Sequence, residues 1–408
     1  MTLKKNMKVI VAAIFFIFAA YVGMQLFVPS NIGSSIQVEV EIPQGATYKQ
    51  AINILYTNNL IRDKNLFIIL GKLSGLDRKI RYGYYSFLGK MSPFQVFKIL
   101  RSGKIIEYEV TVVEGDSLLE IAKKLDAYKL VSVDDFNRLV RDEGVLKELK
   151  VDAPSLEGYL CPQTYKIPKG ASPKTVLKLM VEKLREEYTD DFKKRMEKIK
   201  WSENRVLTLA SIIEKEAVSD EERPVISAVY RNRLKKGMLL QADPTAIYGV
   251  KSSKERITIN DLKKKTDYNT YVIKGLPPGP IASPGIKSIK AALYPANVPY
   301  LYFVSQGNGT HYFSRTWQEH VAAVKRFREI QSASRLQSGD SPPAEPVAAV
   351  KESAAVAKEH VTAAKRPADA KEKETVKKKE STEKKKSVKK KNVKKKKSIK
   401  KKVKRGRH

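Results

Sequence analysis

The hydrophobic pattern of the chain begins with an apolar run over residues 9–28, in which Gln25 is the only strongly polar side chain. About 20 apolar residues are enough to cross a bilayer as a helix. Lys4, Lys5 and Lys8 precede the run, and basic residues beside a span favour the cytoplasmic side. The pattern therefore predicts a single transmembrane anchor that begins with a cytoplasmic N-terminus.

A cleaved signal peptide is the alternative, because a basic start and an apolar centre are also typical of secretory signals. The run is long for such a signal, and no clear small-x-small cleavage site occurs before Pro29. We therefore expect residues 1–8 in the cytoplasm, a single-pass anchor over residues 9–28 in the cytoplasmic (inner) membrane, and everything after Ser30 outside the cytoplasm.

Two later segments repeat one pattern at an offset of 70 residues. Val40–Gly45 and Val110–Gly115 each alternate apolar and polar positions up to a Gly turn. A Ser or Thr cap then precedes a helix with apolar residues at every third or fourth position. Such a unit cannot bury its faces alone. We therefore expect the two units to pack together over residues 36–150, joined by an aromatic strand at Tyr82–Phe87.

A third pattern runs from Leu207 to Glu216, where apolar residues at helical spacing are interrupted by two carboxylates. On a helical wheel Glu214 and Glu216 flank the apolar arc, while Lys215 lies opposite it. A carboxylate among apolar side chains is costly to desolvate, and its raised pKa can provide a general acid near neutral pH. Glutamates that simply face solvent are the alternative, and periodicity does not choose between Glu214 and Glu216.

Local signals bound this helix and the next one. We expect the first helix to begin after Ser202 as N-cap and to end near Val218. Ser219–Glu222 fits a capping box that starts a second helix, which Gly237 would end. Together with the strands of the repeated units, these helices predict an α+β fold.

Charge separates the end of the chain from the rest. The formal net charge is +34, and residues 331–408 carry 26 Lys and Arg against 9 Asp and Glu. This tail has hardly any large apolar side chain, so it cannot bury enough surface to offset the entropy lost on ordering. We expect residues 331–408 to be disordered and dispensable for chemistry. Cys161 is the only cysteine, which excludes an intramolecular disulfide and a multi-cysteine metal site.

Several short motifs follow one another between residues 156 and 311. They are Leu156–Tyr159, Pro162–Tyr165, Ala210–Glu216, Asn232–Leu234, Gln241–Thr245, Tyr248–Gly249, Tyr268–Tyr271, Gly275–Gly279, Tyr302–Val304 and His311. Together they closely resemble the endolytic murein transglycosylases (the MltG or YceG-like family) over residues 38–330. The second repeated unit also resembles LysM-type carbohydrate-binding modules. Whether such units bind glycan or only position the catalytic domain is not decided by fold likeness.

The resemblance implies a catalytic domain over residues 151–330 that cleaves the β-1,4 bond between N-acetylmuramic acid and N-acetylglucosamine in nascent glycan strands. The muramic acid C6 hydroxyl replaces water as the nucleophile and leaves a 1,6-anhydro end. The family motif places the catalytic acid on Glu216, with Glu214 as its rival or as an orienting partner. One glutamate suffices because an intramolecular nucleophile replaces the second carboxylate of ordinary glycosidases.

The same motifs supply candidate glycan contacts. Amide, hydroxyl, aromatic and carboxyl side chains suited to N-acetyl groups, sugar hydroxyls and sugar faces are Gln241, Thr245, Asn269, Tyr271, Tyr159, Tyr165 and Glu157. Tyrosines in strands are more often part of the core, so stacking and packing both remain open for them. Asp243 precedes Pro244 and fits a turn, and Leu276–Pro280 is expected to be a rigid loop.

No cofactor and no metal are expected, because His311 and His320 lack the tight spacing of a ligand pair. The resemblance implies peptidoglycan glycan strands as substrate and peptidoglycan synthases as partners. The lysines of the tail are suited to phosphates. Outside the cytoplasm this favours anionic envelope polymers, and no nucleic acid is expected. The competing function is a membrane-anchored scaffold that binds anionic polymers through its tail without chemistry.

Overall fold

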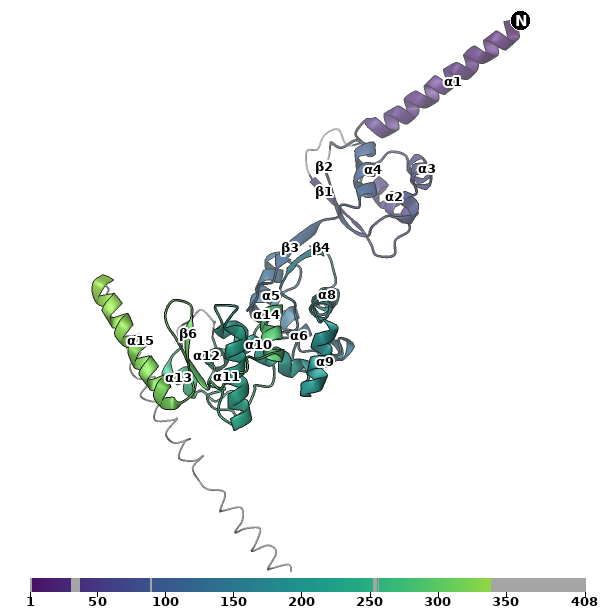
Figure 1. Ribbon diagram of the computed structural model, residues 1–408. Coiled ribbons are helices and arrows are strands. Elements are labelled where there is room, and N and C mark those ends of the chain that lie inside the picture. Colours follow the sequence, from purple (N-terminus) through teal and green to yellow (C-terminus); the bar gives the residue numbers. More distant parts are fainter. Residues whose placement is uncertain (1, 31–36, 89, 252–254, 256, 339–408) are drawn as a thin grey trace, which may run out of the picture. The chain divides into compact units, whose positions relative to one another are not determined.

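The computed structural model describes residues 2–30, 37–88, 90–251, 255 and 257–338, and it is a mixed α+β structure (Figure 1). Among these residues the strands form three separate antiparallel pairs, β1 with β2, β3 with β4, and β5 with β6. The predicted α+β class is confirmed.

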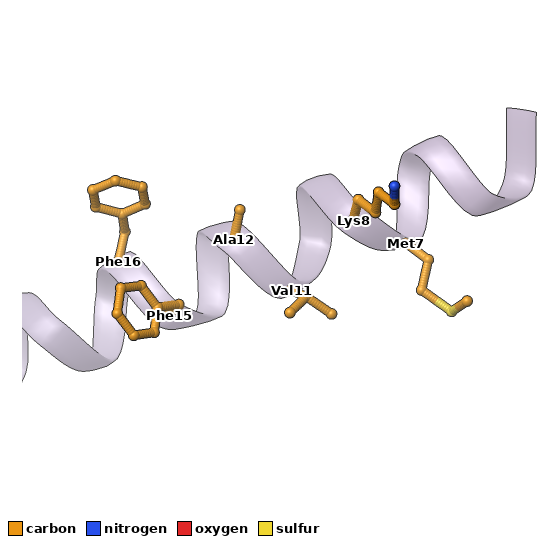
Figure 2. A pocket seen from close by; sticks show the side chains of 6 residues that line it. All are labelled: Met7, Lys8, Val11, Ala12, Phe15 and Phe16. Carbon is orange, nitrogen blue, oxygen red and sulfur yellow. The ribbon is translucent and has the colours of Figure 1, made fainter.

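The first helix, α1 (Thr2–Phe27), contains an apolar stretch of 21 residues, Met7–Phe27, with a mean hydropathy of 2.3. Figure 2 shows a hollow along this helix, and its lining residues are Met7, Lys8, Val11, Ala12, Phe15 and Phe16. All of them belong to α1, so the hollow is the surface of a single apolar helix and not a ligand site. By length and composition the helix is a candidate membrane anchor.

The first repeated unit is a strand–helix–helix–strand arrangement followed by one more helix. Its elements are β1 (Gln37–Ile42), α2 (Tyr48–Thr57), α3 (Lys64–Ser74), a short 3-10 helix (Leu76–Arg78), β2 (Gly83–Leu88) and α4 (Pro93–Ser102). Thr47 caps α2 in a reciprocal capping box with Gln50. Gly45 makes the preceding turn at a φ of 81°, which a residue with a Cβ adopts at a cost.

The second unit begins in the same way. Its elements are β3 (Glu107–Thr111), α5 (Leu118–Ala127), α6 (Val133–Leu139), α7 (Glu143–Glu148) and β4 (Thr164–Pro168). Ser117 caps α5 in a capping box with Glu120, and Gly115 makes the turn at a φ of 84°. The predicted order of strand, turn, cap and helix is therefore confirmed in both units.

The two units do not share one hydrophobic core. The aromatic strand is β2, and it pairs with β1 inside the first unit, whose core runs from Val40 to Leu100. The apolar residues of the second unit belong instead to a separate core that continues to Leu293. The reason is that β4 supplies the second strand for β3, so each unit completes its own sheet. The Lys215 ammonium also donates to the Gly115 carbonyl at 3.2 Å, which attaches this unit to the later helices.

The remaining elements form the region that contains the motifs. They are α8 (Pro173–Glu186), α9 (Asp190–Ile199), α10 (Glu203–Glu216), α11 (Arg223–Lys236), α12 (Asp243–Ile247), α13 (Ile259–Lys263), α14 (Ile286–Leu293), β5 (Tyr302–Ser305), β6 (His311–Ser314) and α15 (Trp317–Ser338). The central helix is α10, which packs against α11, α12 and α14. All residues from Val206 to Ile213 are buried, so α10 is enclosed on every side over this length.

The predicted bounds hold at the start of α10 and at the end of α11, and they fail at the start of α11. Ser202 caps α10 by accepting from the Arg205 backbone N–H, and Gly237 ends α11 in the left-handed conformation. The capping box at Ser219–Glu222 is wrong, because α11 begins at Arg223 without a side-chain cap. The Glu222 carboxylate instead binds the backbone N–H and Nδ1 of His311, at 2.8 and 2.7 Å. The loop Leu276–Pro280 is irregular, as expected, and packs on α10.

The end of the described chain extends past the predicted domain boundary. The helix α15 continues to Ser338, so residues 331–338 are helical where a disordered tail was expected. The reason is local: this stretch has Ala, Gln, Ser, Arg and Leu and lacks Pro and Gly, so nothing in it stops a helix. Residues 339–408, the rest of the predicted disordered tail, lie outside the described residues.

Candidate active site

Glu216, the last residue of α10, lies next to α11 and the start of α12. The Tyr230 hydroxyl of α11 donates to Glu216 Oε1 at 3.3 Å, and Asp243 at the start of α12 faces the same carboxyl group. Glu216 keeps part of its surface open to solvent. Desolvation by the surrounding protein and the negative charge of Asp243 raise the pKa of Glu216 to about 8. Glu216 is therefore largely protonated near neutral pH, as a general acid must be.

Asp243 and Tyr271 form the second part of the site. The Tyr271 hydroxyl donates to Asp243 Oδ1. Asp243 is exposed and opens α12. Desolvation raises the pKa of Asp243, while the hydrogen bond from Tyr271 opposes the rise. Asp243 therefore begins a helix, close to the turn that the sequence indicates, and also places a second carboxylate next to Glu216.

Arg233 of α11 holds two backbone segments next to the site. Its guanidinium is buried and donates to the carbonyls of Leu301 and Leu240, at 2.7 and 2.6 Å. The positive charge acts on Glu216 against the effect of burial and lowers its pKa. These bonds hold the segments before β5 and before α12 against α11, which places Asp243 relative to Glu216.

Glu214 has a different role from Glu216. Its carboxylate accepts from Arg223 at 2.9 Å and from the Gly285 backbone N–H at 2.8 Å. The side chains of Glu214 and Arg223 are only 6% and 9% exposed. Arg223 is also bonded to Asp220 at 3.0 Å and to Ser288. Glu214 thus joins α10 to α11 and α14, and both of its oxygens are engaged in that connection.

Thr245 and Asn269 are both fully buried. Thr245 Oγ1 donates to the Ala242 carbonyl at 2.6 Å and lies 2.8 Å from the Thr270 hydroxyl. The Asn269 amide donates to three backbone carbonyls at the end of α13, and its oxygen accepts from the Tyr271 backbone N–H at 3.0 Å. Their polar groups are used inside the protein, so these two residues shape the loops that carry Asp243 and Tyr271.

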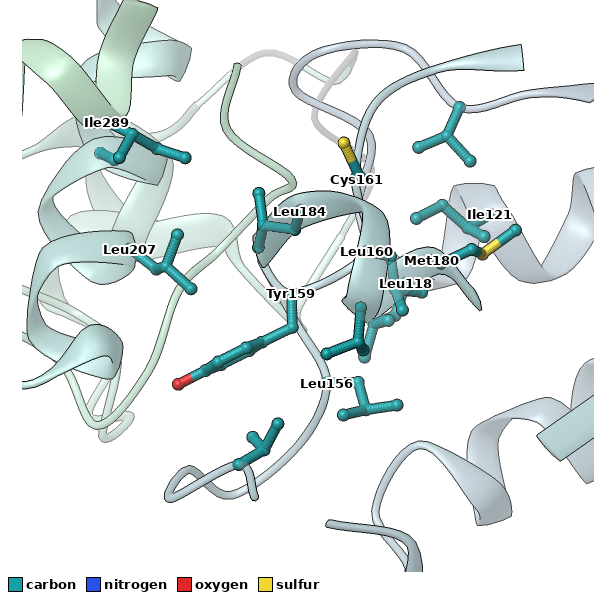
Figure 3. Close-up of a cluster of buried hydrophobic side chains, with 14 of the residues drawn as sticks. Leu118, Ile121, Leu156, Tyr159, Leu160, Cys161, Met180, Leu184, Leu207 and Ile289 are labelled. Carbon is teal, nitrogen blue, oxygen red and sulfur yellow. The ribbon is translucent and has the colours of Figure 1, made fainter. Parts of the chain in front are cut away.

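Tyr159 and Tyr165 lie in the core and away from solvent, at 1% and 3% exposure. Figure 3 shows Tyr159 between Leu207 and the group around Leu156. The Tyr165 hydroxyl donates to the Cys161 carbonyl at 2.7 Å. Neither ring offers a free face for a sugar, so the expected stacking role of both finds no support in their placement, and packing explains them.

Glu157 is also buried, with 2% exposure. Its carboxylate accepts from the Leu118 backbone N–H at 3.1 Å and from the Tyr248 hydroxyl at 2.8 Å. Desolvation raises its pKa to about 7, and these hydrogen bonds act against the rise. Glu157 therefore joins the start of α5 to the end of α12, and its placement supports a structural role more than a direct sugar contact.

Gln241 lies two residues before Asp243 in a left-handed backbone conformation, with a φ of 48°. A residue with a Cβ adopts this conformation at a cost, and such strain collects at functional sites. Its backbone N–H donates to the Thr270 carbonyl at 3.1 Å, which holds the strained turn in place. The side chain is partly exposed, so its amide remains suited to a sugar substituent.

We predict that Gln241→Gly lowers glycan cleavage by up to about tenfold, the effect of one lost hydrogen bond, without lowering the melting temperature. Glycine relieves the left-handed strain but removes the amide. Steady-state cleavage and thermal melting test this together. Lys129→Gly is the matched control, because Lys129 is exposed, has a φ of 54° and lies in the turn after α5. Full activity of Gln241→Gly would contradict the assignment.

Among the described residues no group of three or more His, Cys, Asp or Glu side chains is arranged to hold a metal ion. His311 is bound to Glu222, and His320 stacks on Tyr302 with ring centroids 5.3 Å apart. Burial lowers the pKa of His320 to about 4. The absence of a metal requirement stays a prediction.

A partly buried glutamate whose pKa is raised to about 8 fits the site of an acid–base enzyme. The model of the YceG-like family matches residues 40–326, and the chain belongs to that family. The endolytic murein transglycosylase of Bacillus subtilis is 33% identical over 321 residues, a match that covers 75% of this chain and 89% of the relative.

Two further proteins are similar to this chain. The endolytic murein transglycosylase of Streptococcus pneumoniae is 25% identical, over 72% of this chain and 58% of the relative, so the chain spans little more than half the length of that protein. A YceG-like protein of Listeria monocytogenes, known from a crystal structure, is 32% identical. It aligns with a TM-score of 0.49 over 70% of this chain and 98% of its own.

Proposed function

We propose that this protein is an endolytic murein transglycosylase that cuts peptidoglycan glycan strands with Glu216 as its acid and base. The proposal is carried by one observation, a partly exposed glutamate at the end of α10 whose pKa is raised to about 8 by burial and by Asp243. The relatives named above support the substrate class. Glu214, the rival from the sequence, is engaged in a buried ion pair with Arg223 and does not offer its oxygens to a substrate.

The reaction needs no second carboxylate as a nucleophile. Glu216 gives its proton to the glycosidic oxygen as the bond from muramic acid C1 to that oxygen breaks. The C6 hydroxyl of the same muramic acid then forms the new bond to C1 and returns its proton to Glu216. Water is neither consumed nor released, and the product ends in a 1,6-anhydro ring. Tyr230 orients the acid through its hydrogen bond to Oε1.

We predict that the cleavage rate falls as the pH rises through about 8. The acid form of Glu216 is required for the first proton transfer, and it is lost above its pKa of about 8. The pH dependence of kcat/KM on purified glycan strands measures this directly. A rate that instead rose steadily beyond pH 9 would show that the essential group is required in its charged form, and Glu216 would not be the acid.

The location and partners belong to the same proposal. The lysines in the first two turns of α1 favour a cytoplasmic N-terminus, with the catalytic region outside near the nascent strands. The strand–helix–helix–strand order of the first unit supports a LysM-like role in holding glycan. Family resemblance adds peptidoglycan synthases as partners and termination of elongation as the result. The basic tail is proposed to contact anionic envelope polymers.

Digestion of purified, uncrosslinked glycan strands by the full-length protein in detergent tests the endolytic activity. Cuts inside strands shorten the whole length distribution early in the reaction, and mass spectrometry of the fragments should find anhydromuramic acid ends. Release of only single disaccharides would contradict endolytic action. Tight binding without any cleavage would support the non-catalytic scaffold instead.

A further inference from the structure

Asp243 is the charged side chain next to Glu216 that the proposed reaction does not use. It is exposed, although its neighbours include the buried Tyr230 and Arg233. Tyr271 donates its hydroxyl to Asp243 Oδ1, and among the described residues no side-chain hydrogen bond reaches the other oxygen. A carboxylate held in this way at the edge of an enzyme site has a fixed position and an open side.

The groups around Glu216 act in opposite directions. The Asp243 carboxylate of α12 disfavours the charged form of Glu216, whereas Tyr230 and Arg233 of α11 and the Asp243 backbone N–H favour it. Tyr271, from the loop after α13, faces Asp243. The negative charges of Asp243 and Glu216 both raise the pKa of the Tyr271 hydroxyl. The Arg233 guanidinium donates to the backbone carbonyls of Leu301 and Leu240. After burial, the Asp243 carboxylate is therefore the main influence that offsets the effect of Arg233 on the pKa of Glu216.

We infer that Asp243, held by Tyr271, is a positioning residue whose negative charge keeps Glu216 in its acid form until the glycosidic oxygen arrives. This inference rests on the function proposed above. The same charge lies on the open side of the site, where positive charge develops on the sugar ring as the glycosidic bond breaks. The Asp243 carboxylate thus keeps Glu216 protonated and also stabilises the positive charge on the sugar ring, without taking or giving a proton itself.

The strongest support is the arrangement of hydrogen bonds that fixes Asp243. Thr245 and Thr270 bind each other at 2.8 Å and hold the start of α12 to the loop that carries Tyr271. The Ala242 backbone N–H donates to the Thr270 hydroxyl at 2.9 Å. Two loops from distant parts of the chain are therefore joined behind the pair. A turn that needed only to start a five-residue helix would not require this support.

The pH dependence of cleavage by Asp243→Asn tests the inference. Loss of a nearby negative charge lets Glu216 ionise more easily, so the fall in kcat/KM at high pH should move about one pH unit lower. Tyr271→Phe keeps the charge of Asp243 but removes the hydrogen bond that holds it. The cleavage rate of this variant should drop, while the pH midpoint of the fall in kcat/KM should move less. Asp267→Asn is the matched control, because Asp267 is exposed and carries the same charge near Tyr268. Its pH profile should equal that of the wild type.

A second measurement does not depend on activity. The difference in melting temperature between a protein with Glu216 and its Glu216→Gln partner changes with pH as Glu216 ionises. The change should occur at lower pH in the Asp243→Asn background than in the wild type. An unchanged midpoint in both measurements would overturn the inference, even if Asp243→Asn were less active. Wild-type protein that did not cleave glycan would instead contradict the proposed function, and the melting series would still decide the role of Asp243.

Discussion

Glu216→Gln is expected to lower glycan cleavage by about 10³-fold while leaving the protein folded. Glutamine keeps the shape of the side chain and a hydrogen bond with Tyr230, but it cannot give a proton to the glycosidic oxygen. Because one residue acts first as acid and then as base, no other group compensates for its loss. Product formation from purified glycan strands, measured over hours, gives the rate.

The change in stability of this variant relative to the wild type depends on pH, and its direction follows from the pKa of Glu216. Folding raises the pKa of Glu216 from 4.5 to about 8, so its favourable contribution is complete below about pH 4.5 and is lost as the pH rises through 8. Glutamine does not ionise and keeps that contribution. The melting temperature of Glu216→Gln should therefore rise relative to that of the wild type as the pH increases from 4.5 to 8. A variant that cleaved glycan at the wild-type rate would rule out Glu216 as the acid.

Glu214→Gln should have the opposite profile, a large loss of stability and a retained rate per folded molecule. Breaking a buried ion pair leaves Arg223 short of a partner. We expect a loss on the order of 3 kcal/mol, because Asp220 still compensates part of the charge. In a region of this size that corresponds to a melting temperature roughly 5–10 °C lower. Thermal melting and the rate below the transition separate the two effects.

Glu203→Gln is the control for this comparison. Glu203 lies at the other end of α10 and pairs with Arg185 at 2.8 Å, with 24% and 31% of the side chains exposed. An ion pair of that exposure contributes at most about 1 kcal/mol, so the melting temperature should change little. If Glu214→Gln lost cleavage with unchanged stability, Glu214 would belong to the catalytic machinery and the roles assigned to the two glutamates would have to be exchanged.

The parts of the fold that the sequence predicts are those set by local chemistry. Thr47, Ser117 and Ser202 cap their helices through hydrogen bonds to residues three positions on, and Gly237 ends α11 through its own φ. Such signals lie within one turn of the chain. The Ser219–Glu222 motif has the same local pattern, but His311, almost ninety residues later, takes the Glu222 carboxylate. Local chemistry predicts a cap only where no distant group competes.

The site shows the same division. The pattern of α10 identifies Glu214 and Glu216 as candidates. It does not show that Arg223 binds Glu214 and Tyr230 binds Glu216, because both partners lie on a different helix. Tyr230 itself has no signal in the sequence, whereas Arg233 stands in a recognised motif without an evident role. Hydroxyl and amide residues such as Thr245 look equally suited to a sugar and to a backbone carbonyl, and only burial separates the two uses.

The most direct test of the central claim is glycan digestion in water labelled with heavy oxygen, followed by mass spectrometry of the new ends. Intramolecular attack by the C6 hydroxyl consumes no water, so the muramic acid ends should carry no label and should be lighter than a reducing end by one water. Formation of these ends should disappear with Glu216→Gln. Labelled reducing ends would instead show that water is the nucleophile and that the protein is a hydrolase, which the single-glutamate account does not allow.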